Sequence, residues 1–181
     1  MQALRDSDRD RVRRVLVIDD NEATHQDFRK VLARRRNVLD DMESVLFGEA
    51  RPVEEQDAFE VDSATQGEEG VELVQHKVDE GRPYDLAFVD MRMPPGLDGL
   101  ETIARIWEVD PQLQIVLCAA YLGYTQDEVV AKLGRSEGLA ILGKPFEPGV
   151  VLELAHAMTA SCHLLRQAQL SPALAVLLQA E

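Results

Sequence analysis

The sequence LAFVDMRMPPG, residues 86–96, decides the fold. Four apolar residues lead to Asp90, and a proline-rich loop follows. A continuous apolar run of this length is typical of a strand that is buried on both faces. A second such run, VLVI at residues 15–18, ends on Asp19 and Asp20. We therefore predict two parallel strands, side by side, whose acidic ends share the crevice where open α/β sheets bind ligands.

The rest of the chain alternates short apolar strands with amphipathic helices. Strands are predicted at residues 14–18, 59–62, 86–89, 115–119 and 139–142, with helices at 21–36, at 68–80, after Asp98, after Thr125 and along Val151, Leu154, Ala155 and Met158. This alternation predicts a doubly wound, five-stranded parallel sheet of the α/β class with helices on both faces. The half-polar second strand suits an edge, so the predicted strand order is 2-1-3-4-5, the flavodoxin-like arrangement.

Three segments lie outside this alternation. They are a charged tail at residues 1–13, an insertion at about 38–57 and a C-terminal helical extension at 161–181. The sheet domain itself is predicted to cover residues 14–160, including the insertion. Within these segments, residues 38–47 and Ala173 to Gln179 have helical spacing, and Cys162 and Leu165 are expected to continue the inward stripe of the last sheet-covering helix. The apolar faces of the two predicted helices at 38–47 and 173–179 suggest a homodimer or partner surface. The alternative is that these helices pack onto the parent domain.

Composition excludes several classes of function. The net charge of −14 argues against a nucleic-acid-binding surface, which needs a basic stripe. No apolar run is long enough to span a bilayer, and the first fourteen residues show no signal peptide, so we expect no membrane partner. The two cysteines, Cys118 and Cys162, form no metal or disulfide pattern, which favours a reduced, cytoplasmic setting. The four histidines show no ligand pairing and are expected at the surface.

The acid residues predict a metal site. Asp19, Asp20 and Asp90 repel one another in a shared crevice, and a divalent cation relieves that repulsion. Oxygen-only ligands suit Mg²⁺, which takes one or two carboxylates and keeps several waters. A further strand end brings Lys144 to the same rim of the sheet.

With these residues the chain resembles the receiver domains of two-component response regulators. The matching motifs are Asp19-Asp20, Asp90 with Met93-Pro94 and Asp98-Gly99 behind it, and Lys144-Pro145-Phe146, over about residues 14–158. Each motif is short, but all of them in order, each tied to a strand end, make a strong signal.

The resemblance implies a role for each residue. Asp90 is the expected phosphoacceptor. Its phosphoryl group is expected to come from the phosphohistidine of a sensor histidine kinase or a histidine phosphotransfer protein. Asp20 is expected to ligate Mg²⁺ directly and Asp19 largely through water, with Asp90 and the backbone carbonyl of Arg92 as further ligands. Lys144 is expected to pair with the phosphoryl oxygens, and the bond before Pro145 to be cis.

The chain departs from the receiver pattern at two switch positions. Ala119 stands where receivers place Thr or Ser, and Ile141 stands where they usually place Tyr or Phe. Cys118 does not replace the missing hydroxyl, since its side chain is expected on the opposite face of the strand from Ala119. The loop after Asp90 is also one residue longer.

Three classes of function compete at this point. The first is a phosphorelay receiver that signals through protein contacts, and the second is a pseudo-receiver that works as an interaction or dimerisation module without phosphate. The third is an enzyme with an aspartyl nucleophile, such as a haloacid-dehalogenase-type phosphatase, which needs a second acid where this chain has Arg92. A nucleotide-binding enzyme would need a glycine-rich turn where this chain has residues 21–23. We therefore expect no enzyme and no organic cofactor. We expect no DNA-binding or catalytic output domain to follow, so we expect output through an unknown downstream protein, self-association or onward phosphotransfer.

Overall fold

The computed structural model describes residues 12–33, 59–120 and 125–170. The predicted helices at 38–47 and at Ala173 to Gln179, and most of the predicted tail and insertion, lie outside the described residues. The two ideas about their apolar faces therefore stay predictions. The first strand begins at Arg13, so the sheet domain starts one residue before the boundary expected from the sequence.

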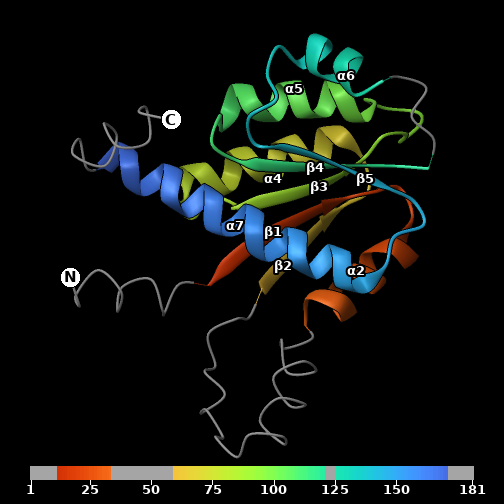
Figure 1. The fold of residues 1–181 in the computed structure, drawn as a ribbon, viewed down its shortest axis with the longest axis horizontal. Coiled ribbons are helices and arrows are strands. Elements are labelled where there is room, and N and C mark those ends of the chain that lie inside the picture. The colour runs from red at the N-terminus through yellow and green to blue at the C-terminus, as the bar shows by residue number, and fades with distance from the viewer. Residues whose placement is uncertain (1–11, 34–58, 121–124, 171–181) are drawn as a thin grey trace, which may run out of the picture.

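Five parallel strands form the sheet, and their order is β2-β1-β3-β4-β5, as predicted. Their bounds are β1 Arg13–Ile18, β2 Phe59–Ala64, β3 Leu86–Asp90, β4 Gln114–Ala119 and β5 Leu139–Gly143. The sheet lies at the centre of the molecule in Figure 1, with helices above and below it. The order places the ends of β1 and β3 side by side, where the acid residues were expected.

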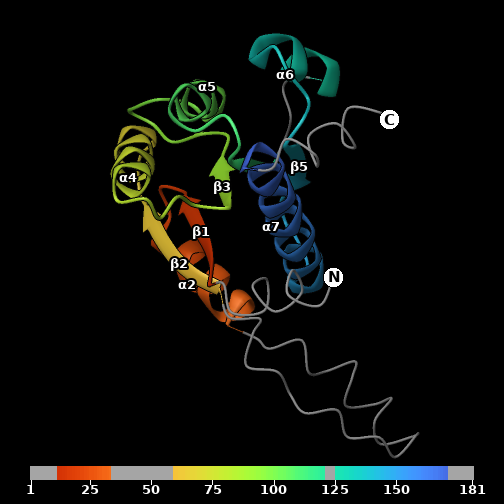
Figure 2. The same ribbon diagram turned by 90° about the vertical axis from the view of Figure 1, so that its left-hand side faces the viewer.

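The helices form two layers. Their bounds are α2 Glu22–Leu32, α4 Gly67–Asp79, α5 Gly99–Val109, α6 Gln126–Leu133 and α7 Pro148–Leu170. In Figure 2, α4 and α5 lie on one side of the strands and α7 on the other, and α2 shares the face of α7. This is the doubly wound arrangement that the alternating sequence predicts.

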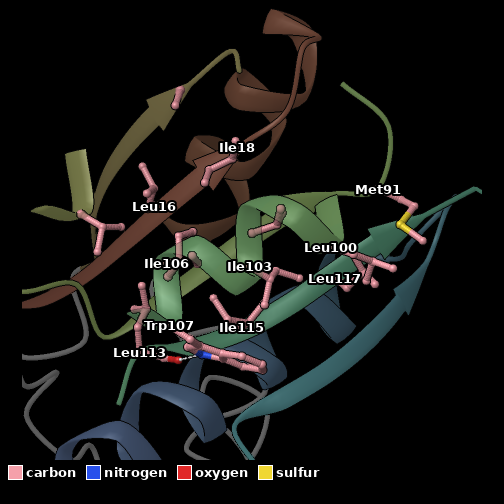
Figure 3. Close-up of a cluster of buried hydrophobic side chains, with 14 of the residues drawn as sticks. Leu16, Ile18, Met91, Leu100, Ile103, Ile106, Trp107, Leu113, Ile115 and Leu117 are labelled. Carbon is pink, nitrogen blue, oxygen red and sulfur yellow. Dashed lines mark hydrogen bonds between the residues drawn. The ribbon is translucent and has the colours of Figure 1, made fainter. Parts of the chain in front are cut away.

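Successive strand residues supply the two cores, because their side chains point to opposite faces. Leu16, Ile18 and Leu117 face α4 and α5, where Ile103, Ile106 and Trp107 pack against them (Figure 3). Val17, Phe88 and Val116 face α2 and α7, where Phe28, Leu32, Val151 and Ala155 cover them. Both faces of the central strands are buried, which explains their unbroken apolar runs.

The helix starts follow the local sequence. Asn21 caps α2 by accepting a hydrogen bond from the backbone N–H of Ala23. Asp98 begins α5 and Thr125 begins α6, each with a reciprocal capping box that its Glu three residues on completes. The caps at Asp98 and Thr125 confirm two predictions.

Helix α7 runs without a break through residue 160, where the sequence suggested a boundary. Cys162 is buried as predicted, but the expectation for Leu165 is wrong, since it is 39% exposed. Arg166 takes the inward position instead. Its guanidinium donates to the Tyr84 carbonyl at 2.8 Å and to Asp110 Oδ2 at 2.7 Å. The last turns of α7 therefore lie against polar loops rather than the apolar sheet. Within the described residues, no helix is long and apolar enough to cross a membrane.

Candidate phosphoacceptor and metal site

Two strand ends bring the three acid residues together. β1 and β3 pair in parallel with Ile18 opposite Val89, so the residues that follow them are neighbours. One carboxylate oxygen from each of Asp19, Asp20 and Asp90 lies within 4.8 Å of the others. The sequence predicted this cluster from the shared edge of the sheet.

Lys144 joins the cluster from β5. Pairing of β4 with β5 places Ala119 opposite Gly143, and the Lys144 backbone N–H donates to the Ala119 carbonyl at 2.8 Å. The Lys144 ammonium donates to Asp19 Oδ2 at 2.7 Å and lies 2.9 Å from Asp90 Oδ1. The peptide bond between Lys144 and Pro145 is cis, as the resemblance implied.

Burial and charge act against each other at this site. The pKa of Asp90 is raised, mainly because the carboxyl group is buried. The hydrogen bond and the charge of Lys144 act to lower this pKa, and the negative charge of Asp19 acts to raise it. Burial alone lowers the pKa of Lys144, but its hydrogen bonds to Asp19 and Asp90 prevail and raise the pKa above its ordinary value. The site therefore holds a charged ammonium beside a phosphoacceptor candidate that is 12% exposed at its side chain.

Every polar group of Asp19 has a partner. Its backbone N–H donates to the Ala64 carbonyl at 3.1 Å, and its own carbonyl lies 2.7 Å from His25 Nε2. Its Oδ1 accepts from the Asn21 backbone N–H at 2.9 Å, and its Oδ2 accepts from Lys144. Asp19 is also only 3% exposed. These contacts leave it less available than Asp20 as a direct metal ligand.

The donor set fits Mg²⁺. Three carboxylates face a single ammonium group, so negative charge is in excess, and all the offered ligand atoms are oxygens. Asp20 is exposed, and its carboxylate forms no ion pair or hydrogen bond among the described residues. Asp20 and Asp90 are the side chains that would hold the ion when it is bound. The Arg92 carbonyl as a ligand stays a prediction, while the Arg92 backbone N–H acts to lower the pKa of the Asp90 carboxylate.

The loop after Asp90 is fixed from two sides. Gly99 donates its backbone N–H to the Met91 carbonyl at 3.0 Å, and a Cβ at Gly99 would lie 2.6 Å from the Asp90 carbonyl oxygen. Only glycine fits that approach, which explains its place after Asp98. On the other side, Glu68 of α4 accepts from the Leu97 backbone N–H at 3.4 Å. The lengthened loop thus contacts α4, and its Pro94–Pro95 bond is a second cis bond that the sequence did not predict.

The switch positions hold apolar side chains. Ala119 is buried, and Ile141 packs at the edge of the same core. Cys118 points into the opposite core, as expected, and burial raises the pKa of its thiol to about 12. It supplies neither a hydroxyl nor a thiolate to the site. In the described part of the β4 end, the side chains at 118–120 therefore offer no hydroxyl to Asp90.

Sequence reasoning missed His25. We expected surface histidines, but His25 is 5% exposed and contacts the Asp19 carbonyl, so that prediction is wrong for it. The available signal was its spacing from Phe28 and Leu32, which places all three residues on the buried face of α2.

Comparisons with known proteins agree with this geometry. The model of the family described as response regulator receiver domain matches residues 37–156. The chain is 36% identical over 95 residues to chemotaxis protein CheY of Listeria monocytogenes, a match that covers 52% of this chain and 73% of that protein. It is 33% identical over 90 residues to CheY of Thermotoga maritima, covering 50% and 68% of the two chains. The family match begins after β1, so the structure is what links Asp19 and Asp20 to this span.

Solved structures show the same fold. A CheY-like receiver domain protein from Methanospirillum hungatei superimposes with a TM-score of 0.60 at 18% identity, covering 84% of this chain and 98% of that chain. A CheX–CheY complex with BeF3 and Mg²⁺ from Borrelia burgdorferi gives a TM-score of 0.52 at 21% identity, with 80% and 87% covered. At these identities the likeness concerns the fold alone.

Proposed function

The chain belongs to the response regulator receiver domain family, and we propose that it accepts a phosphoryl group on Asp90 with Mg²⁺ as cofactor. The observation that carries this proposal is the meeting of three carboxylates and one ammonium at the ends of β1, β3 and β5. A carboxylate can attack a phosphoryl group and hold it as an acyl phosphate.

The transfer needs positioning and charge neutralisation more than covalent help from the protein. The P–N bond of a phosphohistidine breaks, a P–O bond forms at an Asp90 carboxylate oxygen, and the imidazole leaves with the electron pair of the broken bond. Lys144 lies 2.9 Å from Asp90 Oδ1, so its charge is in place to pair with phosphoryl oxygens. A bound Mg²⁺ supplies further positive charge at the same oxygens.

The donor class follows from the family. We propose a sensor histidine kinase or a histidine phosphotransfer protein as the donor, and a downstream protein as the recipient of the signal. We also propose a cytoplasmic location and no separate enzymatic activity. CheX is the protein that accompanies CheY in the Borrelia complex, and a protein partner of that kind is one candidate for output here.

A second candidate function is a pseudo-receiver that acts through contacts without phosphate. Ala119 and Ile141 favour it, because the hydroxyl and the aromatic ring of the receiver switch are absent at these positions. The intact acid cluster with its bound ammonium favours phosphoryl acceptance over this alternative.

Intact mass after incubation with Mg²⁺ and acetyl phosphate separates the two functions. A phosphoreceiver gains the mass of one phosphoryl group, and the gain disappears when Mg²⁺ is chelated. A protein that is folded, binds Mg²⁺ and gains no phosphate from acetyl phosphate or from a phosphorylated histidine phosphotransfer domain would support the pseudo-receiver.

A further inference from the structure

His25 reaches the acid cluster from behind. It lies on α2, where Phe28 and Leu32 are the other buried residues. Its Nε2 is 2.7 Å from the backbone carbonyl oxygen of Asp19. Because a carbonyl oxygen can only accept, Nε2 carries the hydrogen and donates.

A histidine is an unusual choice for this position. The buried face of an amphipathic helix normally holds apolar residues, and a buried polar group costs free energy unless it is hydrogen-bonded. Leu or Phe would fill the space beside Phe28 without that requirement. What the imidazole adds is a single donor that is aimed at one backbone oxygen.

That oxygen belongs to the peptide unit between Asp19 and Asp20. The peptide unit is planar, so fixing its carbonyl also fixes the direction in which the chain enters Asp20. The Asp19 N–H is already held by the Ala64 carbonyl at the end of β2, and the Asn21 N–H by Asp19 Oδ1. The hydrogen bond from His25 completes the contacts that hold this turn. His25 lies neither in the turn nor in the charged cluster.

We infer that His25 is a positioning residue for the divalent-cation site: its Nε2–H holds the Asp19 carbonyl and so aims Asp20 toward Asp90. The inference rests on the proposed function, since it assumes that these acids bind Mg²⁺. Asp20 has most to gain from such support, because it is exposed and its own carboxylate contacts no hydrogen-bond or ion-pair partner among the described residues. Side chains that orient a metal ligand typically contribute 10–100-fold to affinity.

The test is the Mg²⁺ affinity of the full chain, measured by calorimetry for the wild type and four variants. His25→Leu removes the donor and keeps the bulk. His25→Gln retains an N–H at about the reach of Nε2, whereas His25→Asn carries the same amide one carbon shorter. Phe28→Leu disturbs the same buried face of α2 without touching the acid cluster, and melting temperatures without metal report the structural cost of every change.

We expect His25→Leu and His25→Asn to weaken Mg²⁺ binding about tenfold, and His25→Gln to stay close to the wild type. Phe28→Leu should lower the melting temperature and leave Mg²⁺ affinity unchanged. Should the Leu variant not fold, the Asn and Gln pair still decides the matter. Unchanged affinity in the Asn variant, or equal weakening in Phe28→Leu, would overturn the inference and leave the proposed function standing. A wild-type protein that binds no Mg²⁺ would overturn both.

Discussion

The two sides of the site differ in the polar groups that they offer. At the ends of β1 and β3, three carboxylates lie within 4.8 Å of one another and Lys144 bonds to two of them. At the ends of β4 and β5, Ala119 and Ile141 pack into the core and offer no polar group. The first corner holds the residues of the proposed phosphoryl acceptance, and the second holds the two positions at which the chain departs from the receiver switch.

Phosphoryl acceptance and the conformational response to it have separate physical requirements. Acceptance needs a nucleophile, a cation site and a positive charge, which all remain. A conformational response needs contacts that differ between two states, because a ligand with equal affinity for both shifts neither. The Ala119 side chain cannot make such a contact with phosphate. We therefore expect phosphorylation with a weak response at β4, α6 and β5.

The largest expected effect is at Asp90. Asp90→Asn replaces the nucleophilic carboxylate by a neutral amide and should abolish the gain of phosphate from acetyl phosphate and Mg²⁺, as read by intact mass. Asp127→Asn changes an exposed acid on α6 and serves as the control, which should gain phosphate like the wild type. Phosphate gain at the wild-type rate in Asp90→Asn would show that another residue is the acceptor.

The second effect distinguishes Asp19 from Asp20, the two acids that follow β1. Lys144 pairs with Asp19 and Asp90 rather than with Asp20. Asp20→Asn should therefore relieve repulsion among the carboxylates and raise the melting temperature without metal, while it abolishes Mg²⁺ binding. Asp19→Asn should lower the melting temperature instead, because it removes the negative charge from a part-buried contact of 2.7 Å to Lys144. Normal Mg²⁺ binding by Asp20→Asn would contradict the metal assignment.

A smaller effect is expected from restoring the hydroxyl. Ala119→Thr places a donor at the end of β4, and a hydrogen bond to a charged group contributes about 1.5–3 kcal/mol. The variant should show a larger difference in hydrogen exchange across β5 between its free form and its BeF3⁻-bound form than the wild type shows. Ala119→Val matches the shape without the hydroxyl, so an equal increase in that variant would rule out the hydrogen bond as the cause.

Local patterns carried much of the sequence-based prediction. The apolar runs at β1, β3 and β4 indicated central strands, and the alternation at β2 indicated an edge. Asp98 and Thr125 indicated where α5 and α6 begin. The acid cluster could be predicted because the ends of adjacent parallel strands meet at one edge.

Contacts between distant residues could not be read in this way. The inward position of Arg166 depends on the carbonyl of Tyr84, which is far away in sequence, so the stripe was extended to Leu165 in error. The role of His25 depends on a backbone oxygen, which has no signature in the side-chain sequence. Glu68 meets Leu97 only because α4 and the loop after Asp90 pack together.

The most direct test of the separation between acceptance and response uses one preparation for two measurements. Intact mass establishes that the wild type has gained phosphate on incubation with Mg²⁺ and acetyl phosphate. Hydrogen exchange on the same sample then compares β4 and residues 125–146 with the residues around Asp20 and Asp90. We expect a gain of phosphate, protection confined to the loops at Asp20 and Asp90, and little change in β4, α6 and β5. Large protection across β4, α6 and β5 in the phosphorylated wild type would contradict the separation of acceptance from response.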